Sequence, residues 1–135
     1  MKYLLFLPIL LLTFCKTDSS SSTDTASADT TEKIVRKDLS VMEANKWLQS
    51  DNPPVLLDVR TSEEYSEGHI EGSTLIDYNS SSFDSKLSEL DKDESYLLYC
   101  RSGNRSGKAV HKMIGLGFTD VTNMVGGYNA WSSKY

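Results

Sequence analysis

The sequence predicts an α/β fold with a central parallel sheet and helices on both faces. The apolar runs at 55–59 and 96–99 are almost continuous, as expected of strands buried on both faces of a parallel sheet. Segments in which apolar residues have helical spacing separate the strand-like runs, and alternating strands and helices build this kind of sheet. The length of 135 residues suits one folded domain.

Residues 1–15 are predicted to be a signal peptide. One basic residue, Lys2, precedes an apolar run at 3–12, and this run is shorter than the about 20 residues needed to span a bilayer. The run is followed by Leu12-Thr13-Phe14-Cys15, which resembles the lipobox of bacterial lipoproteins, in which the cysteine is acylated. Phe14 departs from that motif, because the position before the cysteine normally holds Gly, Ala or Ser.

Residues 16–32 are predicted to form a disordered tether. They are almost entirely Ser, Thr, Asp and Ala, and such a segment buries too little apolar surface to fold. Acylation of Cys15 would make the domain at 33–135 an extracytoplasmic lipoprotein, anchored to a membrane of the bacterial cell envelope. The small residues Ala26-Ser27-Ala28 offer an alternative cleavage site, which would discard Cys15 with the leader.

The elements of the domain are expected in a fixed order along the chain. Capping residues, breakers and apolar spacing set their limits. They are a strand at 34–35, a helix at 41–48 opened by Ser40 and Glu43, a strand at 55–59, a helix at 61–67 stopped by Gly68, a strand at 74–76, a helix at 83–90, a strand at 95–99, a helix after the loop through Ile114, a strand at 121–124 and a helix at 128–133.

The candidate nucleophile is Cys100. It ends an apolar strand and faces the first turn of the next helix, where unpaired amide groups and the helix dipole favour a thiolate. Arg101 and Arg105 add positive charge beside the sulfur, which predicts an anion site and a lowered thiol pKa. A structural buried cysteine is the alternative, but two arginines and a glycine are poor neighbours for an inert core thiol.

The loop after Cys100 is predicted to bind the substrate through residues 101–105. Gly103 suits an unusual backbone conformation or a close approach to a ligand, and Ser106 is predicted to cap the next helix. Cysteine phosphatases place five residues between cysteine and arginine, whereas four lie between Cys100 and Arg105. The tighter loop suits a smaller group such as a terminal sulfur.

Other polar residues are assigned supporting or structural roles. Asp58 and Arg60 follow a buried strand, where α/β sheets gather ligands, so they either reach the site or form an ion pair that holds its loops. His69 and His111 are expected to make structural hydrogen bonds. These two isolated histidines, with no second free cysteine in the domain, make no metal site.

Three blocks of the domain resemble the single-domain rhodaneses, a family of sulfurtransferases. Leu57-Asp58-Val59-Arg60, with Glu64 to Ser73, resembles the family's first signature; the sequence from Cys100 to Ser106 resembles its active loop; and Gly117-Phe118 with Met124 to Trp131 resembles its C-terminal block. The resemblance covers nearly all of Ile34 to the C-terminus. It implies a rhodanese fold and sulfur transfer without a cofactor.

The resemblance implies covalent catalysis through a persulfide on Cys100. A small anionic donor such as thiosulfate would supply the sulfur, and cyanide or a thiol would accept it, while Arg101, Ser102, Gly103, Asn104 and Arg105 bind the substrate. A cysteine phosphatase or arsenate reductase remains an alternative, as does a non-catalytic module that senses sulfur or redox state. The net charge of −5 argues against nucleic acid as a partner, and we expect a monomer.

Overall fold

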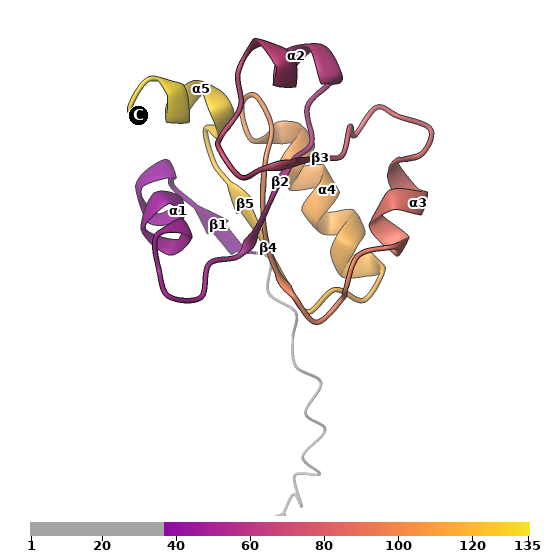
Figure 1. The fold of residues 1–135 in the computed structure, drawn as a ribbon. Helices are drawn as coiled ribbons and strands as arrows, with labels where there is room; N and C mark the ends of the chain where they lie inside the picture. The colour runs from indigo at the N-terminus through magenta and orange to yellow at the C-terminus, as the bar shows by residue number, and fades with distance from the viewer. Residues whose placement is uncertain (1–36) are drawn as a thin grey trace, which may run out of the picture. The chain divides into compact units, whose positions relative to one another are not determined.

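A computed structural model describes residues 37–135, and within them five strands form one parallel sheet (Figure 1). The strand order is β1-β5-β4-β2-β3, and every neighbouring pair is parallel. The predicted fold class is therefore confirmed. The strands are β1 (Lys37–Leu39), β2 (Val55–Asp58), β3 (Thr74–Leu75), β4 (Ser95–Tyr99) and β5 (Asp120–Met124).

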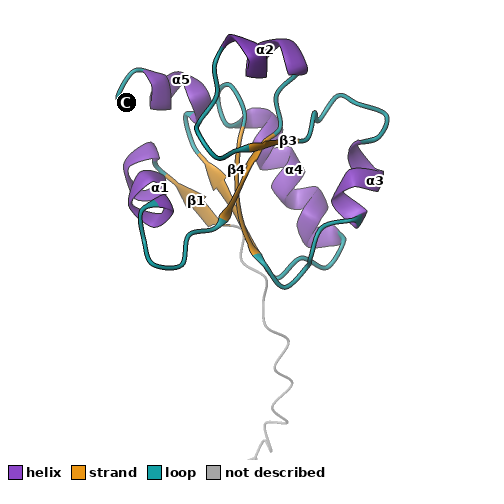
Figure 2. Cartoon of the chain, in the orientation of Figure 1, coloured by secondary structure: helices purple, strands orange, loops and turns teal. Residues whose placement is uncertain are grey.

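The helices cover both faces of the sheet (Figures 1 and 2). On one face lie α3 (Phe83–Ser88) and α4 (Asn104–Gly115), and on the other lie α1 (Val41–Leu48) and α5 (Gly127–Ser132). The short helix α2 (Ser62–Glu67) follows the carboxyl end of β2. Successive strand residues point to opposite faces, so Leu57 and Leu98 join the core beneath α4, whereas Leu56 and Leu97 join the core beneath α1.

The predicted capping box of α1 is confirmed, and α2 begins with a second capping box. Ser40 caps α1, and its side chain accepts the Glu43 amide while Glu43 accepts the Ser40 amide. Thr61 and Glu64 make the same capping box at α2, which ends at Gly68. These reciprocal bonds satisfy amide groups that a helix start otherwise leaves unpaired.

Some predicted boundaries differ from the structure. The strand expected at 34–35 lies outside the described residues, and the first described strand begins at Lys37. Val55 is 38% exposed, so β2 is buried only beyond its first residue. Helix α3 ends at Ser88, before the predicted limit, although Leu90 still packs against the core. In the described residues, no helix is long and apolar enough to cross a membrane.

Candidate active site

Cys100 directly follows β4, between the carboxyl ends of its neighbours β2 and β5. Its side chain is only 1% exposed. The Gly103 amide donates a hydrogen bond to the Cys100 sulfur at 3.1 Å, and the Ser106 hydroxyl lies 3.5 Å from the same atom. The sulfur therefore accepts a hydrogen bond from the Gly103 amide at the start of α4 and lies within reach of the Ser106 hydroxyl.

Backbone amides in the first turn of α5 orient the loop by binding its carbonyl oxygens. The Tyr128 amide donates to the Cys100 carbonyl at 2.7 Å, and the Asn129 amide donates to the Arg101 carbonyl at 3.0 Å. In a trans peptide the N–H points opposite to the C=O. These two bonds therefore turn the Arg101 and Ser102 amides away from α5.

The pKa of the Cys100 thiol is lowered by this arrangement. Burial alone would raise the pKa, because it disfavours the charged thiolate. Hydrogen bonds from the Ser106 hydroxyl and from the amides of Ser106, Ser102 and Gly103 outweigh that effect. The predicted direction of the shift is confirmed. The largest lowering contribution comes from the Ser106 hydroxyl, followed by the amides of Ser106, Ser102 and Gly103, and Arg105 also interacts with the sulfur.

The two loop arginines differ in their surroundings. Arg105 donates to both carboxylate oxygens of Glu64, each at 2.7 Å. This ion pair balances the charge of Arg105 and holds the pKa of Glu64 at about 2, with hydrogen bonds from Arg105 as the main cause. Arg101 is exposed and makes no ion pair with residues 37–135. Ser102 and Asn104 are exposed beside it.

Asp58 and Arg60 form a buried ion pair, one of the two alternatives stated for them. The Arg60 guanidinium donates to both Asp58 oxygens, with a shortest distance of 2.7 Å, and to the Gly68 carbonyl at 2.7 Å. It also lies 4.2 Å from the ring centroid of Tyr128. The pair ties the end of β2 to the loop after α2 and to α5.

Ser106 does not cap α4, contrary to the prediction. The N-cap is Gly103, at φ 96°, so Ser106 is the third residue of the helix. From there its buried hydroxyl points to Cys100 and donates to Asn123 Oδ1 at 2.7 Å. Asn123 Nδ2 in turn donates to Asp38 at 3.0 Å.

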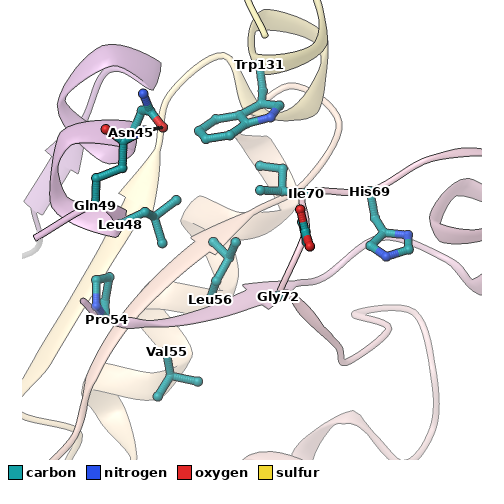
Figure 3. A pocket seen from close by; sticks show the side chains of 11 residues that line it. Asn45, Leu48, Gln49, Pro54, Val55, Leu56, His69, Ile70, Gly72 and Trp131 are labelled. Atoms are coloured by element: carbon teal, nitrogen blue, oxygen red, sulfur yellow. Dashed lines mark hydrogen bonds between the residues drawn. The ribbon is translucent and has the colours of Figure 1, made fainter. Parts of the chain in front are cut away.

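Two of the hollows on the described surface differ in the residues that line them. One, of about 300 Å³, adjoins the loop and is lined by Arg60, Glu64, Glu67, Arg101, Tyr128, Asn129 and Ser132. The other, of about 610 Å³, lies between α1, β2 and α5, where Leu48, Leu56, Ile70 and Trp131 line it (Figure 3). None of its lining residues belongs to the loop 100–106. The smaller hollow is thus the candidate substrate entrance.

The histidines lie outside this constellation. His69 Nδ1 is 3.0 Å from the Tyr65 carbonyl, and its ring stacks on that of Tyr65 with centroids 3.7 Å apart. The structural role expected for His69 is confirmed. His111 is an exposed residue of α4. Within 37–135, no group of three His, Cys, Asp or Glu side chains could hold a metal ion.

The site includes residues that the sequence reasoning did not assign to it. Glu64 was assigned only to the predicted helix at 61–67 and to the first block of the resemblance, and Gly127 only to its last block. Asn123 lies in β5 and Asp38 in the neighbouring edge strand β1. A single polar residue in a strand gives no signal of its partner. The three polar residues contact the site through segments distant in sequence.

The rhodanese-like domain matches residues 40–134. Thiosulfate sulfurtransferase 16 of Arabidopsis thaliana is 36% identical over 88 residues, covering 58% of this chain and 73% of that protein. The protein named "Probable adenylyltransferase/sulfurtransferase MoeZ" of Mycobacterium tuberculosis is 34% identical over 92 residues, covering 68% of this chain but 24% of MoeZ. This chain therefore spans about a quarter of the length of MoeZ.

A solved structure agrees with these matches. The crystal structure of a rhodanese-like domain protein from Staphylococcus aureus superposes with a TM-score of 0.65 at 33% identity. The superposition covers 70% of this chain and 90% of that one. The chain belongs to the rhodanese-like domain family.

Proposed function

We propose that the protein is a sulfurtransferase that moves a sulfane sulfur from a small anionic donor, such as thiosulfate, to cyanide or a thiol. The observation that carries this proposal is that the Cys100 sulfur accepts hydrogen bonds from backbone amides of the loop that follows it. Only four residues lie between Cys100 and Arg105. The similarity to a thiosulfate sulfurtransferase of Arabidopsis thaliana supports the same reaction class.

In the first step, the Cys100 thiolate attacks the outer sulfur of thiosulfate. A Cys–S bond forms, the S–S bond of thiosulfate breaks, and sulfite leaves with the bonding electron pair. The charge passes to the terminal sulfur of the new persulfide. Amide groups at the start of α4 lie where they can stabilise that charge without reorganising.

In the second step, cyanide attacks the terminal sulfur, thiocyanate leaves, and the electron pair of the S–S bond returns to Cys100 as a thiolate. A thiolate acceptor reacts in the same way and leaves as a persulfide. Arg101 is the loop cation without an ion pair among the described residues, so we assign it the attraction of the anionic donor. Arg105, already paired with Glu64, helps to fix the loop.

The test is Cys100→Ser, which replaces the nucleophile and keeps a small polar side chain in the loop. Thiosulfate:cyanide turnover should vanish, while the thermal midpoint stays close to that of the wild type. Mass spectrometry of the wild type after exposure to thiosulfate should show one added sulfur on Cys100. Turnover close to wild type in the variant would overturn the assignment.

The wild type and Cys100→Ser, assayed with other substrates, separate the alternative functions. Phosphate-ester or arsenate turnover that depends on Cys100, without sulfur transfer, would favour a cysteine phosphatase or arsenate reductase. A persulfide that forms but is not passed to any acceptor would favour a sulfur- or redox-sensing module.

We also propose that the mature protein is a monomeric lipoprotein held on the cell envelope through Cys15. The apolar run at 3–12, the cysteine shortly after it and the polar tether at 16–32 support this assignment. All three features lie outside the described residues.

A further inference from the structure

A chain of hydrogen bonds connects the edge of the sheet to the Cys100 sulfur. Asp38 on β1 accepts from Asn123 Nδ2 at 3.0 Å, and Asn123 Oδ1 on β5 accepts from the Ser106 hydroxyl at 2.7 Å. The Ser106 oxygen lies 3.5 Å from the sulfur. Ser106 is fully buried and Asn123 is 2% exposed, so water has little access to the middle of the chain.

The direction of these bonds follows from the groups involved. The Asp38 carboxylate can only accept, so it must face the amino group of Asn123, and the carbonyl oxygen of Asn123 must face Ser106. A serine hydroxyl has one proton to donate. That proton can go to Asn123 or to the sulfur of Cys100, but not to both.

We propose that Asn123 is a positioning residue, oriented by Asp38, that competes with the Cys100 sulfur for the single hydroxyl proton of Ser106. While Cys100 is a neutral thiol, Ser106 donates to Asn123. When the thiolate forms, the Ser106 hydroxyl hydrogen turns to the sulfur, and no heavy atom needs to move. After sulfur uptake the charge lies on the outer sulfur, so the proton returns to Asn123.

This competition makes the thiolate state of Cys100 less favourable. Donation to the sulfur leaves the buried Asn123 oxygen without a donor, and an unsatisfied buried acceptor is unfavourable. Asn123 therefore opposes the thiolate, whereas the loop amides favour it. This balance would keep Cys100 from being permanently charged between turnovers.

Other charged groups around the sulfur stay unchanged in the test variants at Asn123. Arg105, which interacts with the sulfur, is paired with Glu64 from α2, and the other charged groups near the loop are Arg101 and, after β2, the Asp58–Arg60 pair. Among the hydrogen bonds of residues 37–135, only the Asp38 carboxylate is connected to the sulfur through Asn123. Variants at Asp38 must therefore separate charge from orientation.

The experiment measures the rate of Cys100 alkylation by iodoacetamide against pH, with no sulfur donor present. The inference rests on the proposed role of Cys100 as nucleophile, but this measurement does not depend on sulfur transfer. Asn123→Val removes the competing acceptor and keeps a residue suited to a strand. The midpoint should fall by about half to one pH unit, the size expected for one hydrogen bond.

The matched control is Thr122→Val on the same strand. Thr122 is buried, and its hydroxyl oxygen has no hydrogen-bond partner among the described residues. Because neighbouring strand residues point to opposite faces, Thr122 points away from Ser106. Its substitution should leave the alkylation midpoint unchanged. If Thr122→Val shifted the midpoint as much as Asn123→Val, both shifts would indicate a general disturbance of β5 and contradict the proposal.

A double-mutant cycle tests whether the effect passes through Ser106. Ser106→Ala should raise the midpoint, because the sulfur loses a donor. Asn123→Val should then have no further effect in the Ser106→Ala background. A fall that persists without the hydroxyl overturns the proposal, as does an unchanged or raised midpoint in the single Asn123→Val variant.

Variants at Asp38 provide a second test of the proposal if Asn123→Val does not fold. Asp38→Ala at this exposed position lets the Asn123 amide turn its amino group to Ser106, so the midpoint should fall. Asp38→Asn loses the same charge but keeps an oxygen that can accept from Asn123, so it should restore the wild-type midpoint. Equal falls in both variants would indicate a charge effect and overturn the proposed orientation role, as would the absence of a fall in Asp38→Ala.

Discussion

Gly127 makes the close contact between α5 and the active-site loop possible. A Cβ atom at this position would overlap the Cys100 carbonyl oxygen and lie 2.8 Å from the Arg101 carbonyl carbon. Its φ of 55° is also one that residues with side chains rarely adopt. The glycine therefore lets the amides of Tyr128 and Asn129 reach the loop carbonyls.

Gly127→Ala should lower the free energy of unfolding by more than about 2 kcal/mol and reduce sulfur transfer at least tenfold, because the overlap displaces the loop. The control is Gly117→Ala, where φ is 91° but no atom lies within 4 Å of the new Cβ. It should show backbone strain alone, about 1 kcal/mol, with activity intact. Urea unfolding and turnover measure both; equal losses in the two variants would contradict the role of the contact.

The position of Cys100, between the end of a strand and the start of a helix, could be predicted from sequence because its signals are local. Cys100 ends an apolar run and precedes a helical pattern, and both features lie within a few residues of it. The partners of Ser106 and Arg105 could not be predicted in this way. Asn123 and Glu64 reach them from β5 and α2, and only the folded sheet brings these segments together.

Helix α2 positions the active-site loop through one side chain. Glu64 closes the capping box with Thr61 and also accepts both hydrogen bonds from Arg105. The ordinary pKa of a glutamate is 4.5, and that of Glu64 is about 2, mainly because of Arg105. A lowered pKa in the fold means that ionised Glu64 stabilises the protein above about pH 4.5, and that this stabilisation is lost as the pH falls towards 2.

Glu64→Gln should reduce the free energy of unfolding by about 1–2 kcal/mol at pH 7, a value discounted for the partial exposure of the pair. Glutamine still serves in a capping box, so the loss reports on the ion pair. Glu63→Gln, on the exposed side of the same helix, is the control. Urea unfolding from pH 7 to pH 2 should show the difference from wild type shrinking; a difference independent of pH would contradict the linkage.

The length of the loop between Cys100 and Arg105 is expected to select the substrate. One glycine inserted after Gly103 lengthens the loop towards that of the cysteine phosphatases. Sulfur transfer should be lost, because the amides no longer converge on the sulfur, and binding of phosphate should appear in calorimetry. Insertion of one glycine after Gly72, an open position outside the site, is the control. Unchanged sulfur transfer in the lengthened loop would show that loop size does not select the substrate.

The elements themselves were largely predictable, and their departures have physical causes. The capping box of Ser40 and Glu43 marked the start of α1, because this motif acts within four residues. Ser106 was misassigned because a serine at the start of a helix suits an N-cap, whereas Gly103 occupies that position with a positive φ. The hydroxyl instead serves a buried site that only tertiary packing creates.

At the scale of the whole molecule, the described domain starts at Lys37 and the family match starts at residue 40. The proposed lipid attachment at Cys15 therefore rests on the leader sequence alone. Acyl chains on this residue would make membrane attachment durable, because each buried CH₂ contributes about 0.8 kcal/mol. The residue that opposes this proposal is Phe14, since a bulky side chain before the cysteine should slow the lipoprotein peptidase.

Expressed with its leader in a bacterial host, the protein should partition into the detergent phase, and intact-mass analysis should show acyl chains on an N-terminal Cys15. Cys15→Ala should release the protein or leave an uncleaved precursor. The matched variant Phe14→Ala should increase the acylated fraction, because it restores the small residue of the lipobox. A soluble wild-type protein with its N-terminus at Asp29 would contradict the lipid anchor, since it would show that cleavage after Ala28 discards Cys15 with the leader.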